Sequence, residues 1–374
     1  MKVINNALTR TVCSSGICTG CKACLNVCSK GAITVRDNLD SFEPVIDISK
    51  CVDCGLCTKV CPGIARRKLR DPIYSRQGWA PDSIRKTSSS GGAASELIRS
   101  FIANGGYVAS CMFRDGEFKF VVTGDPSEAK LFAGSKYVKS DPKLIYNEVR
   151  EILNKGSKVL FIGLPCQVAA VLNVCENIVN TDKLYTADLI CHGTPSVKLL
   201  EMYLADNNIE LDKAKDVSFR EGNNFGLIVD GNRLMPGNIL DHYTYAFLKS
   251  IDYFECCYDC KYAVIRRVSD ITLGDAWGQM SDTDPNGVSL ILCQTEKGRE
   301  LVENAGLELF DVDLEKAVPA NPQLNHPSEK PDKRDLFFKI VKNGKSFSTA
   351  MKKMFPMFCV KNSVKLFVNK RRIR

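Results

Sequence analysis

Apolar and polar positions along the middle of the chain form short apolar runs, each followed by an amphipathic segment. The run KVLFIG (158–163) predicts a strand, and QVAAVLNV, just after a Gly-Leu-Pro-Cys turn, predicts a helix. LYTADLIC (184–191) predicts the next strand, HGTPS a turn and VKLLEMYLADNN a second helix. This order is typical of an α/β domain with a mostly parallel or mixed sheet, whose ligands bind beyond the carboxyl ends of the strands.

A further helix is predicted ahead of these elements. In AASELIRSFIANGG the apolar residues from Ala94 to Ile102 fall on one helical face, and a Gly-Gly pair ends the helix. The preceding segment, 64–92, has no sustained apolar period and predicts a connector that passes into the loop SSSGG. Such a loop exposes backbone N–H groups where the helix dipole is positive, which suits a phosphate. Simple N-capping by Ser90 is the alternative, and the loop alone favours it.

Cysteine is frequent, with 18 in 374 residues, and the cysteines are grouped. The stretch MKVINNALTR has no apolar core, and no run approaches the roughly 18 apolar residues that cross a bilayer. A cysteine-rich chain without export or transmembrane signals is expected in the cytoplasm. In that compartment grouped cysteines bind metal more often than they form disulfides.

Two cysteine runs form a repeat near the N-terminus. CTGCKACLNVCSK (18–30) and CVDCGLCTKVCPG (51–63) both have the C-x2-C-x2-C-x3-C spacing of two-cluster ferredoxins, in which the fourth cysteine binds the sister cluster. The predicted ligands are Cys18, Cys21, Cys24 and Cys61 for one 4Fe-4S cluster, and Cys51, Cys54, Cys57 and Cys28 for the other. A zinc site is disfavoured, because four-ligand zinc sites usually combine two separated pairs. With hairpin strands in GAITVRD and FEPVIDISK, residues 1–70 are expected to form an α+β ferredoxin-like dicluster domain.

Four later cysteines are candidates for a third cluster. Cys166 and Cys191 each follow a predicted strand and so can meet at one edge of the sheet. The Cys257-x2-Cys260 pair can supply two more thiolates from one turn, which completes a set of four. A packed thiol, or a nucleophile, is the alternative for Cys166. His192 is the candidate catalytic residue, although neighbours at a strand end point in different directions, which argues against a Cys–His pair.

Six stretches in the same order resemble a known family. They are SSSGGAASELI, GSKYVKS, GLPCQVAA, DLICHGTPS, CCYDCKYAVIRRVSDITLGDAWG and RDLFF. Together they are similar to the beta subunit of coenzyme F420 hydrogenase/dehydrogenase, here preceded by a ferredoxin extension. The resemblance covers about residues 15–340 and is more specific than any one of its motifs.

The resemblance implies an iron–sulfur flavoprotein with FAD, 4Fe-4S clusters and the 8-hydroxy-5-deazaflavin coenzyme F420 as a substrate. It places the flavin and iron–sulfur domain at residues 71–332. The flavin contacts that it implies are Ser88, Ser89, Ser90, Gly91 and Gly92 in the loop, Lys136 and Tyr137 in GSKYVKS, and Gly274 and Asp275 in SDITLGDAWG.

The expected function is electron transfer from an external donor through the clusters to FAD, with hydride transfer to or from a deazaflavin, in either direction. The expected partners are a redox protein or low-potential donor and a hydride-carrying coenzyme. One alternative is a non-catalytic electron-relay subunit of a larger redox complex. Another is a reductase of a small, sugar-linked substrate in polysaccharide biosynthesis, since similar chains occur beside surface-polysaccharide genes.

Basic charge is concentrated in the C-terminal tail. Residues 333–374 contain thirteen Lys and Arg and one acid, a charge of +12, so the rest of the chain carries −4 of the total +8. Aromatic residues alternate with lysines in 333–350, which is more typical of a packed amphipathic helix than of a nucleic-acid-binding segment. Nucleic acid is therefore not an expected partner. Residues 361–374 are expected to be mobile, with at most weak contact to acidic partners.

Overall fold

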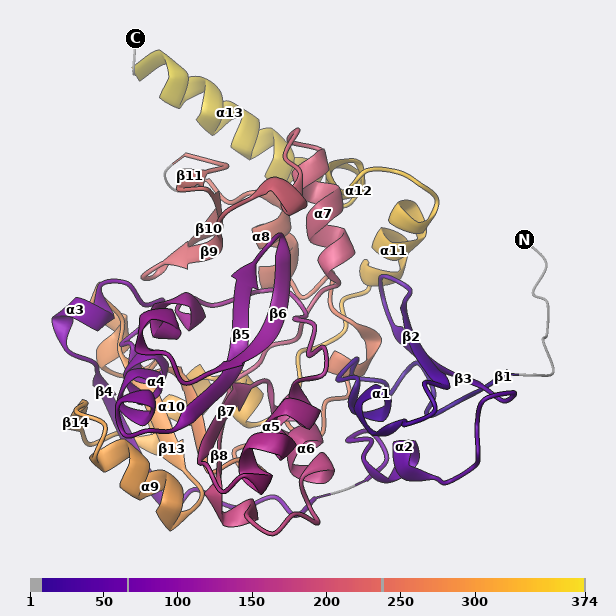
Figure 1. Cartoon of the computed structure of the whole chain (residues 1–374). Coiled ribbons are helices and arrows are strands. Elements are labelled where there is room, and N and C mark those ends of the chain that lie inside the picture. Colours follow the sequence, from indigo (N-terminus) through magenta and orange to yellow (C-terminus); the bar gives the residue numbers. More distant parts are fainter. Residues whose placement is uncertain (1–8, 66, 237–238, 373–374) are drawn as a thin grey trace.

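The computed structural model describes residues 9–65, 67–236 and 239–372. The N-terminal residues form a small domain on one side of a larger body built around a mixed sheet (Figure 1). A long helix near the C-terminus projects from the body on another side (Figure 1). Within the described ranges, no helix combines the length and the apolar character that crossing a membrane requires.

The small domain contains an antiparallel sheet with strand order β1-β3-β2. Its elements are β1 (Thr9–Thr11), α1 (Ala23–Val27), β2 (Ile33–Asp37), β3 (Phe42–Asp47) and α2 (Leu56–Lys59). β2 and β3 are the predicted hairpin strands, which are therefore confirmed. α1 and α2 follow left-handed residues, Lys22 and Gly55, so each cysteine run turns sharply before its helix begins.

The body contains an eight-stranded sheet with strand order β14-β4-β13-β12-β8-β7-β5-β6. The bounds are β4 (Tyr74–Trp79), β5 (Tyr107–Arg114), β6 (Glu117–Thr123), β7 (Val159–Gly163), β8 (Leu184–Leu189), β12 (Ile271–Asp275), β13 (Ser289–Cys293) and β14 (Glu308–Phe310). The neighbours β5, β7, β8 and β12 are parallel, whereas the outer pairs are antiparallel. The predicted mixed sheet is confirmed, with β7 and β8 as the two expected strands.

Helices cover both faces of this sheet: α4 (Ala93–Ala103), α5 (Ile145–Asn154), α6 (Pro165–Val174), α9 (Glu296–Glu303) and α10 (Leu314–Ala320). Two further helices, α7 (Val197–Ala205) and α8 (His242–Leu248), pack with each other and with α12 (Phe347–Met354) instead. Side chains alternate along β7: Val159 and Phe161 pack with α5 and α6, whereas Leu160 and Ile162 pack with α4 and α9. β7 is therefore buried on both faces, which explains its uninterrupted apolar run.

The expectation that 64–92 is only a connector was wrong. This segment contains β4 and α3 (Asp82–Arg85). The sequence of β4, YSRQGW, has no apolar alternation, but its backbone pairs with β13 and β14 on both sides. A side chain at Gly78 would overlap the Glu308 backbone, so the close approach of β14 depends on this glycine.

The C-terminal helices pack beside a second small sheet of β9 (Val217–Glu221), β10 (Asn224–Val229) and β11 (Asn232–Arg233). They are α11 (Arg334–Lys342), α12 (Phe347–Met354) and α13 (Pro356–Arg372). Phe337, Phe338 and Phe347 are buried in the cluster that also includes α7 and α8, which confirms the predicted packing of 333–350. α13 continues as a helix to Arg372 (Figure 1); the predicted mobility of 361–374 stays a prediction.

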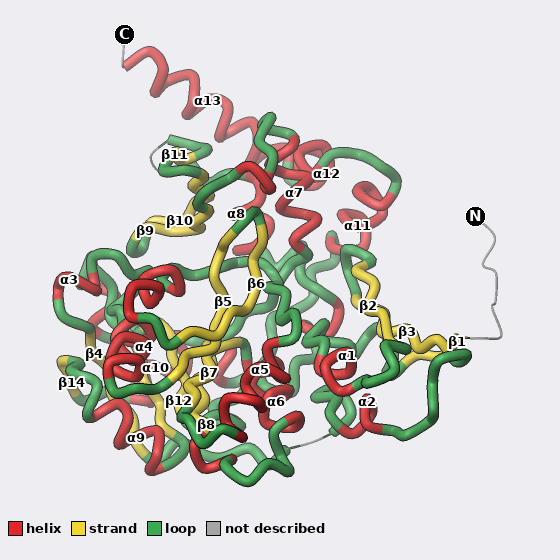
Figure 2. Tube along the Cα trace, in the orientation of Figure 1, coloured by secondary structure: helices red, strands yellow, loops and turns green. Residues whose placement is uncertain are grey.

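Polar contacts fix the small domain against the body. Tyr146 Oη donates to Cys21 O at 2.9 Å, Tyr262 Oη donates to Pro62 O at 3.2 Å, and Asn173 Nδ2 donates to Val60 O at 3.1 Å. Figure 2 shows α1 beside α5 and α6, and their apolar side chains share one cluster. The first cysteine run is therefore held directly against the helices that follow β6 and β7.

Candidate functional site

The first predicted cysteine set is enclosed. Cys18, Cys21, Cys24 and Cys61 are buried and line one small cavity, together with Cys13. The Gly20 N–H donates to the Cys18 thiol, and burial raises the pKa of Cys21 to about 12. Such buried sulfurs gain from a bound cation or cluster, which stabilises the thiolate form.

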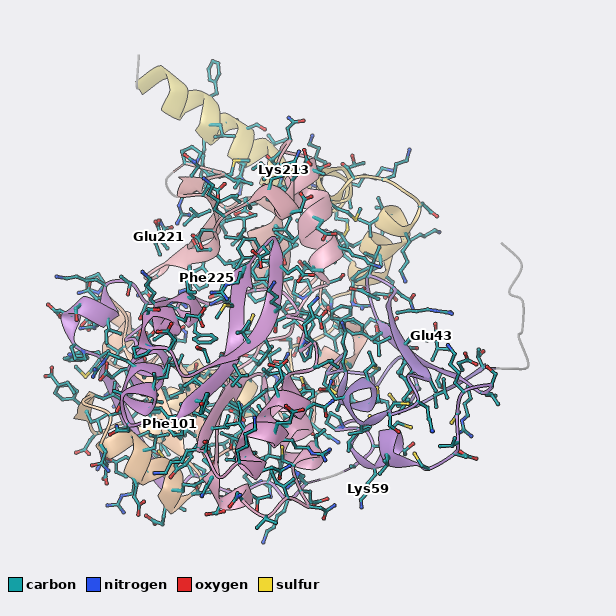
Figure 3. The ribbon with its side chains drawn as sticks, in the orientation of Figure 1. Glu43, Lys59, Phe101, Lys213, Glu221 and Phe225 are labelled. Carbon is teal, nitrogen blue, oxygen red and sulfur yellow. The ribbon has the colours of Figure 1, made fainter. Side chains whose placement is uncertain are left out.

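The second predicted set lies on the outer side of the small domain. Cys28, Cys51 and Cys57 are partly buried against the same hydrophobic cluster, and Cys54 is exposed. Ala32 N–H donates to Cys28 Sγ at 3.4 Å. The adjacent α2 carries Lys59, which points into solvent (Figure 3). A cluster at this set would therefore be the one nearest to solvent.

The third predicted set also comes together. Cys166 lies in the first turn of α6, Cys191 follows β8, and the last two cysteines lie at and after the short 3-10 helix η4 (Glu255–Cys257). Burial raises the pKa of Cys191, and Cys257, Cys166 and Cys260 raise it further. The pKa of Cys260 is raised to about 12 by burial, with contributions from Cys166 and Cys257. Cys256 shares a hydrogen bond with Cys257, which lowers the pKa of Cys257 to about 6.

All eighteen cysteines are free, so the grouped thiols are available as ligands. In the part of the chain that the structure describes, no group of three or more His, Cys, Asp or Glu side chains is arranged to hold a metal ion. A single metal ion requires its ligands to surround one centre, whereas in a 4Fe-4S cubane each cysteine binds a different iron atom. Four thiols without disulfides, converging on one site, fit the donor set of a 4Fe-4S cluster at the first and third sets.

Lys139, which sequence reasoning missed, lies between these two sets. Its side chain is buried, and Nζ donates to Cys166 Sγ at 3.5 Å. Burial disfavours its charge, but Cys166, Cys256, Cys257 and Cys21 outweigh that effect and raise the pKa of Lys139. Lys139 belongs to the stretch GSKYVKS, but no sequence period marks it as buried. Cys166 also raises the pKa of Cys21 by electrostatic repulsion, and both raise the pKa of Tyr146, so the first and third sets are neighbours.

A cavity of about 500 Å³ opens at the carboxyl ends of β7, β8 and β12, a size typical of cofactor pockets. The predicted residues that line it are Ser88, Ser89, Ser90, Gly92, Lys136, Tyr137, His192, Gly274 and Asp275. Cys191 lines it as well, so the cavity adjoins the third cysteine set. Gly91 instead lies against the backbone of Gly78 and Ser289, where a side chain would not fit.

The start of α4 faces this cavity without a side-chain cap. The N-cap is Gly92, in the left-handed conformation with φ 83°, so the expectation that Ser90 caps the helix was wrong. Ser90 Oγ donates to Val288 O at 3.2 Å instead, and Ser89 Oγ accepts from Ser135 N–H at 2.8 Å. The first-turn residues Ala94 and Ser95 line the cavity. Ala93 N–H donates to Ser289 Oγ at 3.4 Å, so the N–H groups of Ala94 and Ser95, with the positive end of the helix dipole, are the ones that suit an anionic group such as a phosphate.

Arg220, which the sequence did not single out, organises the opposite wall. Its Nη1 lies 2.8 Å from Asp275 Oδ2 and donates to Tyr137 Oη at 3.4 Å. The guanidinium lies over the ring of Phe225, 5.0 Å from its centroid. Arg220 comes from β9 and Phe225, labelled in Figure 3, from β10 of the small sheet, so the wall depends on contacts distant in sequence.

Two further candidates have distinct surroundings. Burial lowers the pKa of Lys136, whose Nζ donates to Phe132 O at 2.8 Å and to Ala133 O at 2.6 Å. Burial also lowers the pKa of His192, which keeps its imidazole neutral at pH 7. His192 is held through its backbone, since Ser328 Oγ donates to its carbonyl at 2.6 Å. Lys136 is thus directed toward the loop backbone, whereas His192 lies on the cavity wall.

Two segments of the chain match families of known proteins. Residues 156–312 match the family described as the C terminus of the coenzyme F420 hydrogenase/dehydrogenase beta chain, and residues 17–64 match the 4Fe-4S dicluster domain. Over 317 residues the chain is 24% identical to coenzyme F420-dependent sulfite reductase of Methanocaldococcus jannaschii, covering 78% of this chain and 46% of that protein. Over 187 residues it is 24% identical to the F polypeptide of F420H2 dehydrogenase from Methanosarcina mazei, covering 47% and 53%.

The chain therefore spans about half the length of these curated relatives. Among solved structures, a chain of the F420-reducing NiFe hydrogenase complex from Methanosarcina barkeri is 19% identical, with a TM-score of 0.45, over 76% of this chain and 92% of that one. The chain therefore contains a segment, residues 156–312, that matches the beta-subunit family of coenzyme F420 hydrogenase/dehydrogenase, and in front of it a segment, residues 17–64, that matches a 4Fe-4S dicluster domain.

Proposed function

We propose that the protein is an iron–sulfur flavoprotein oxidoreductase that passes electrons between 4Fe-4S clusters and FAD, with hydride transfer to or from a deazaflavin of the coenzyme F420 type. The observation that carries the proposal is the position of Cys191. It belongs to the third cysteine set and also lines the large cavity, so a cluster and a cofactor at these places would be adjacent.

The cysteine sets form an ordered path from solvent to the cavity. The outer set contains the exposed Cys54, and the enclosed first set contains Cys21. Cys21 is close enough to Cys166 of the third set for the two thiols to interact electrostatically. Clusters transfer single electrons, whereas a deazaflavin accepts a hydride. FAD, when bound, supplies the chemistry that connects the two kinds of transfer.

The cavity walls fit FAD. The first turn of α4 offers backbone N–H groups for a phosphate, and Arg220 supplies a buried positive charge held by Asp275. Tyr137 stacks on Phe247 with ring centroids 4.5 Å apart and adds an aromatic wall. His192 lines the same cavity and is the proposed residue for proton exchange with a bound coenzyme. These residues would bind and orient the cofactor and limit the access of water.

Electron exchange with a protein partner is proposed at the outer cysteine set. Three apolar side chains next to its cysteines in the chain are exposed: Ile48 at 40%, Val52 at 62% and Leu56 at 46%. Exposed apolar residues that gather around one site are typical of a protein-binding surface. This surface favours docking of a redox protein whose own electron carrier approaches Cys54.

Anaerobic purification with iron, sulfide and flavin analysis tests the proposal. Three clusters require about twelve iron atoms per chain, and a filled cavity requires one FAD. Cys191→Ser should lower the iron content by about four atoms and leave the ferredoxin spectra unchanged. Intact clusters with no flavin, in the presence of added FAD, would instead support a non-catalytic electron-relay subunit. Turnover with a sugar-linked substrate but none with coenzyme F420 would support the other alternative.

A further inference from the structure

Lys139 is a buried cation without a carboxylate partner. Its side chain is almost fully enclosed, and its backbone N–H donates to Pro195 O at 2.9 Å. The ion pairs found among residues 9–65, 67–236 and 239–372 do not include Lys139. Its Nζ donates to Cys166 Sγ instead, at 3.5 Å.

Burying an isolated ammonium group is costly unless an anion compensates it. The groups that raise the pKa of Lys139 are thiols from both enclosed cysteine sets, including Cys166, Cys257 and Cys21. The positive charge of Lys139 in turn lowers the pKa of Cys18 in the first set. When both sets hold clusters, the cysteinates supply the negative charge that this lysine otherwise lacks.

Other cations lie near the same sulfurs. Arg267 lowers the pKa of Cys260 in the third set, and Lys261 lowers the pKa of Cys61 in the first. Lys139 Nζ donates to Cys166 of the third set, and Cys166 packs against the same hydrophobic cluster as Cys21 of the first set, so Lys139 lies beside both groups that must exchange an electron.

We propose that Lys139 is a positioning residue whose fixed positive charge raises the reduction potentials of the inner ferredoxin cluster and the third cluster together. The inference rests on the proposed function, because both clusters must be bound. In the step concerned, one electron leaves the reduced cluster and enters its oxidised neighbour. Each cluster becomes more negative by one charge when it receives the electron, and the ammonium group of Lys139 stabilises that charge at both places.

The test uses the full-length protein, reconstituted anaerobically with iron, sulfide and FAD. Three variants are compared with the wild type: Lys139→Met, Lys139→Arg and, as a control, Lys345→Met, which removes the same charge from an exposed position. The readout is the reduction potential of each cluster by electron paramagnetic resonance during redox titration. Cys51→Ser and Cys191→Ser identify the outer-cluster and third-cluster signals.

Lys139→Met is expected to make the inner and third clusters harder to reduce. At a fixed potential, the ratio of reduced to oxidised cluster should fall about tenfold, which corresponds to 59 mV for one electron. The outer cluster should change less, Lys139→Arg should largely restore both potentials, and Lys345→Met should match the wild type.

Unchanged potentials in a fully loaded Lys139→Met protein would overturn the inference. If Lys139→Met loses iron, the result for Lys139→Arg distinguishes the two explanations. Iron loss in Lys139→Arg as well would show that the residue acts through packing and would overturn the inference. Full iron content and near-normal potentials in Lys139→Arg would support it. Iron and flavin content of the wild type are measured first. A wild-type protein without the third cluster contradicts the proposed function itself, so the two failures are distinguishable.

Discussion

The buried ion pair on the cavity wall gives a quantitative prediction. Arg220 Nη1 lies 2.8 Å from Asp275 Oδ2, and the two side chains are only 3% and 16% exposed. Arg220→Met would leave the Asp275 carboxylate without its partner. Removing one member of a buried pair costs about 3–5 kcal/mol, and the contact of Asp275 with the cavity reduces this to roughly 2–3 kcal/mol. For a body of roughly 300 residues, with an unfolding entropy of about 0.6 kcal/mol/K, the expected fall in Tm is about 3–5 °C.

The assay is thermal unfolding of the protein with and without added FAD. Lys213→Met is the matched control, since Lys213 pairs with Glu210 at 2.7 Å but both side chains are more than 60% exposed, at 69% and 63%. The control should leave Tm unchanged. Replacing Asp275 by Asn in the Arg220→Met background should recover part of the loss, because no unpaired charge then remains. The reasoning is refuted if Arg220→Met is as stable as Lys213→Met, or if the second substitution recovers nothing.

Three further predictions concern other parts of the chain. Gly20 has φ 65°, and a side chain there would overlap the Phe42 ring, so Gly20→Ala should lower the iron content by about four atoms per chain. The control is Gly31→Ala, because Gly31 has a similar φ of 57° but open space around it. Equal iron loss in both variants would contradict the argument. Cys257→Ser should remove the third cluster and Cys256→Ser should not; the reverse pattern of iron loss would show that Cys256 is the ligand. Burial raises the pKa of Asp252 from 3.8 to about 8, so the native state keeps a proton that the unfolded chain releases between these values. The contribution of Asp252 to stability is therefore lost as pH rises through that range, and Asp252→Asn should raise Tm more at pH 8.5 than at pH 5; a gain that does not depend on pH would refute this.

The sequence predicted those parts of the site that local spacing encodes. The two cysteine runs specify their own turns, and the ends of β7 and β8 bring Cys166 and Cys191 to one edge of the sheet because parallel strands end together. Ser88, Tyr137 and Asp275 line one cavity, although the sequence does not show where a flavin would lie.

What the sequence did not predict depends on contacts between distant segments. β4 is a strand because β13 and β14 pair with its backbone, not because its side chains alternate. Arg220 reaches Asp275 across 55 positions, and Lys139 reaches Cys166 across 27. Ser90 does not cap α4, because its hydroxyl bonds to Val288, which is supplied by the loop before β13. No local period contains this information.

The most direct test of the central claim follows electrons from the cavity to the ferredoxin clusters. Reduced coenzyme F420 is mixed anaerobically with FAD-loaded wild-type protein and with Cys191→Ser, and flavin and cluster absorbance are recorded together. In the wild type both should be reduced in sequence, the flavin first. In Cys191→Ser the flavin should still be reduced while the ferredoxin clusters stay oxidised, because the third cluster links them. Equal rates of ferredoxin-cluster reduction in both proteins, or a wild-type flavin that reduced coenzyme F420 does not reduce, would contradict the account.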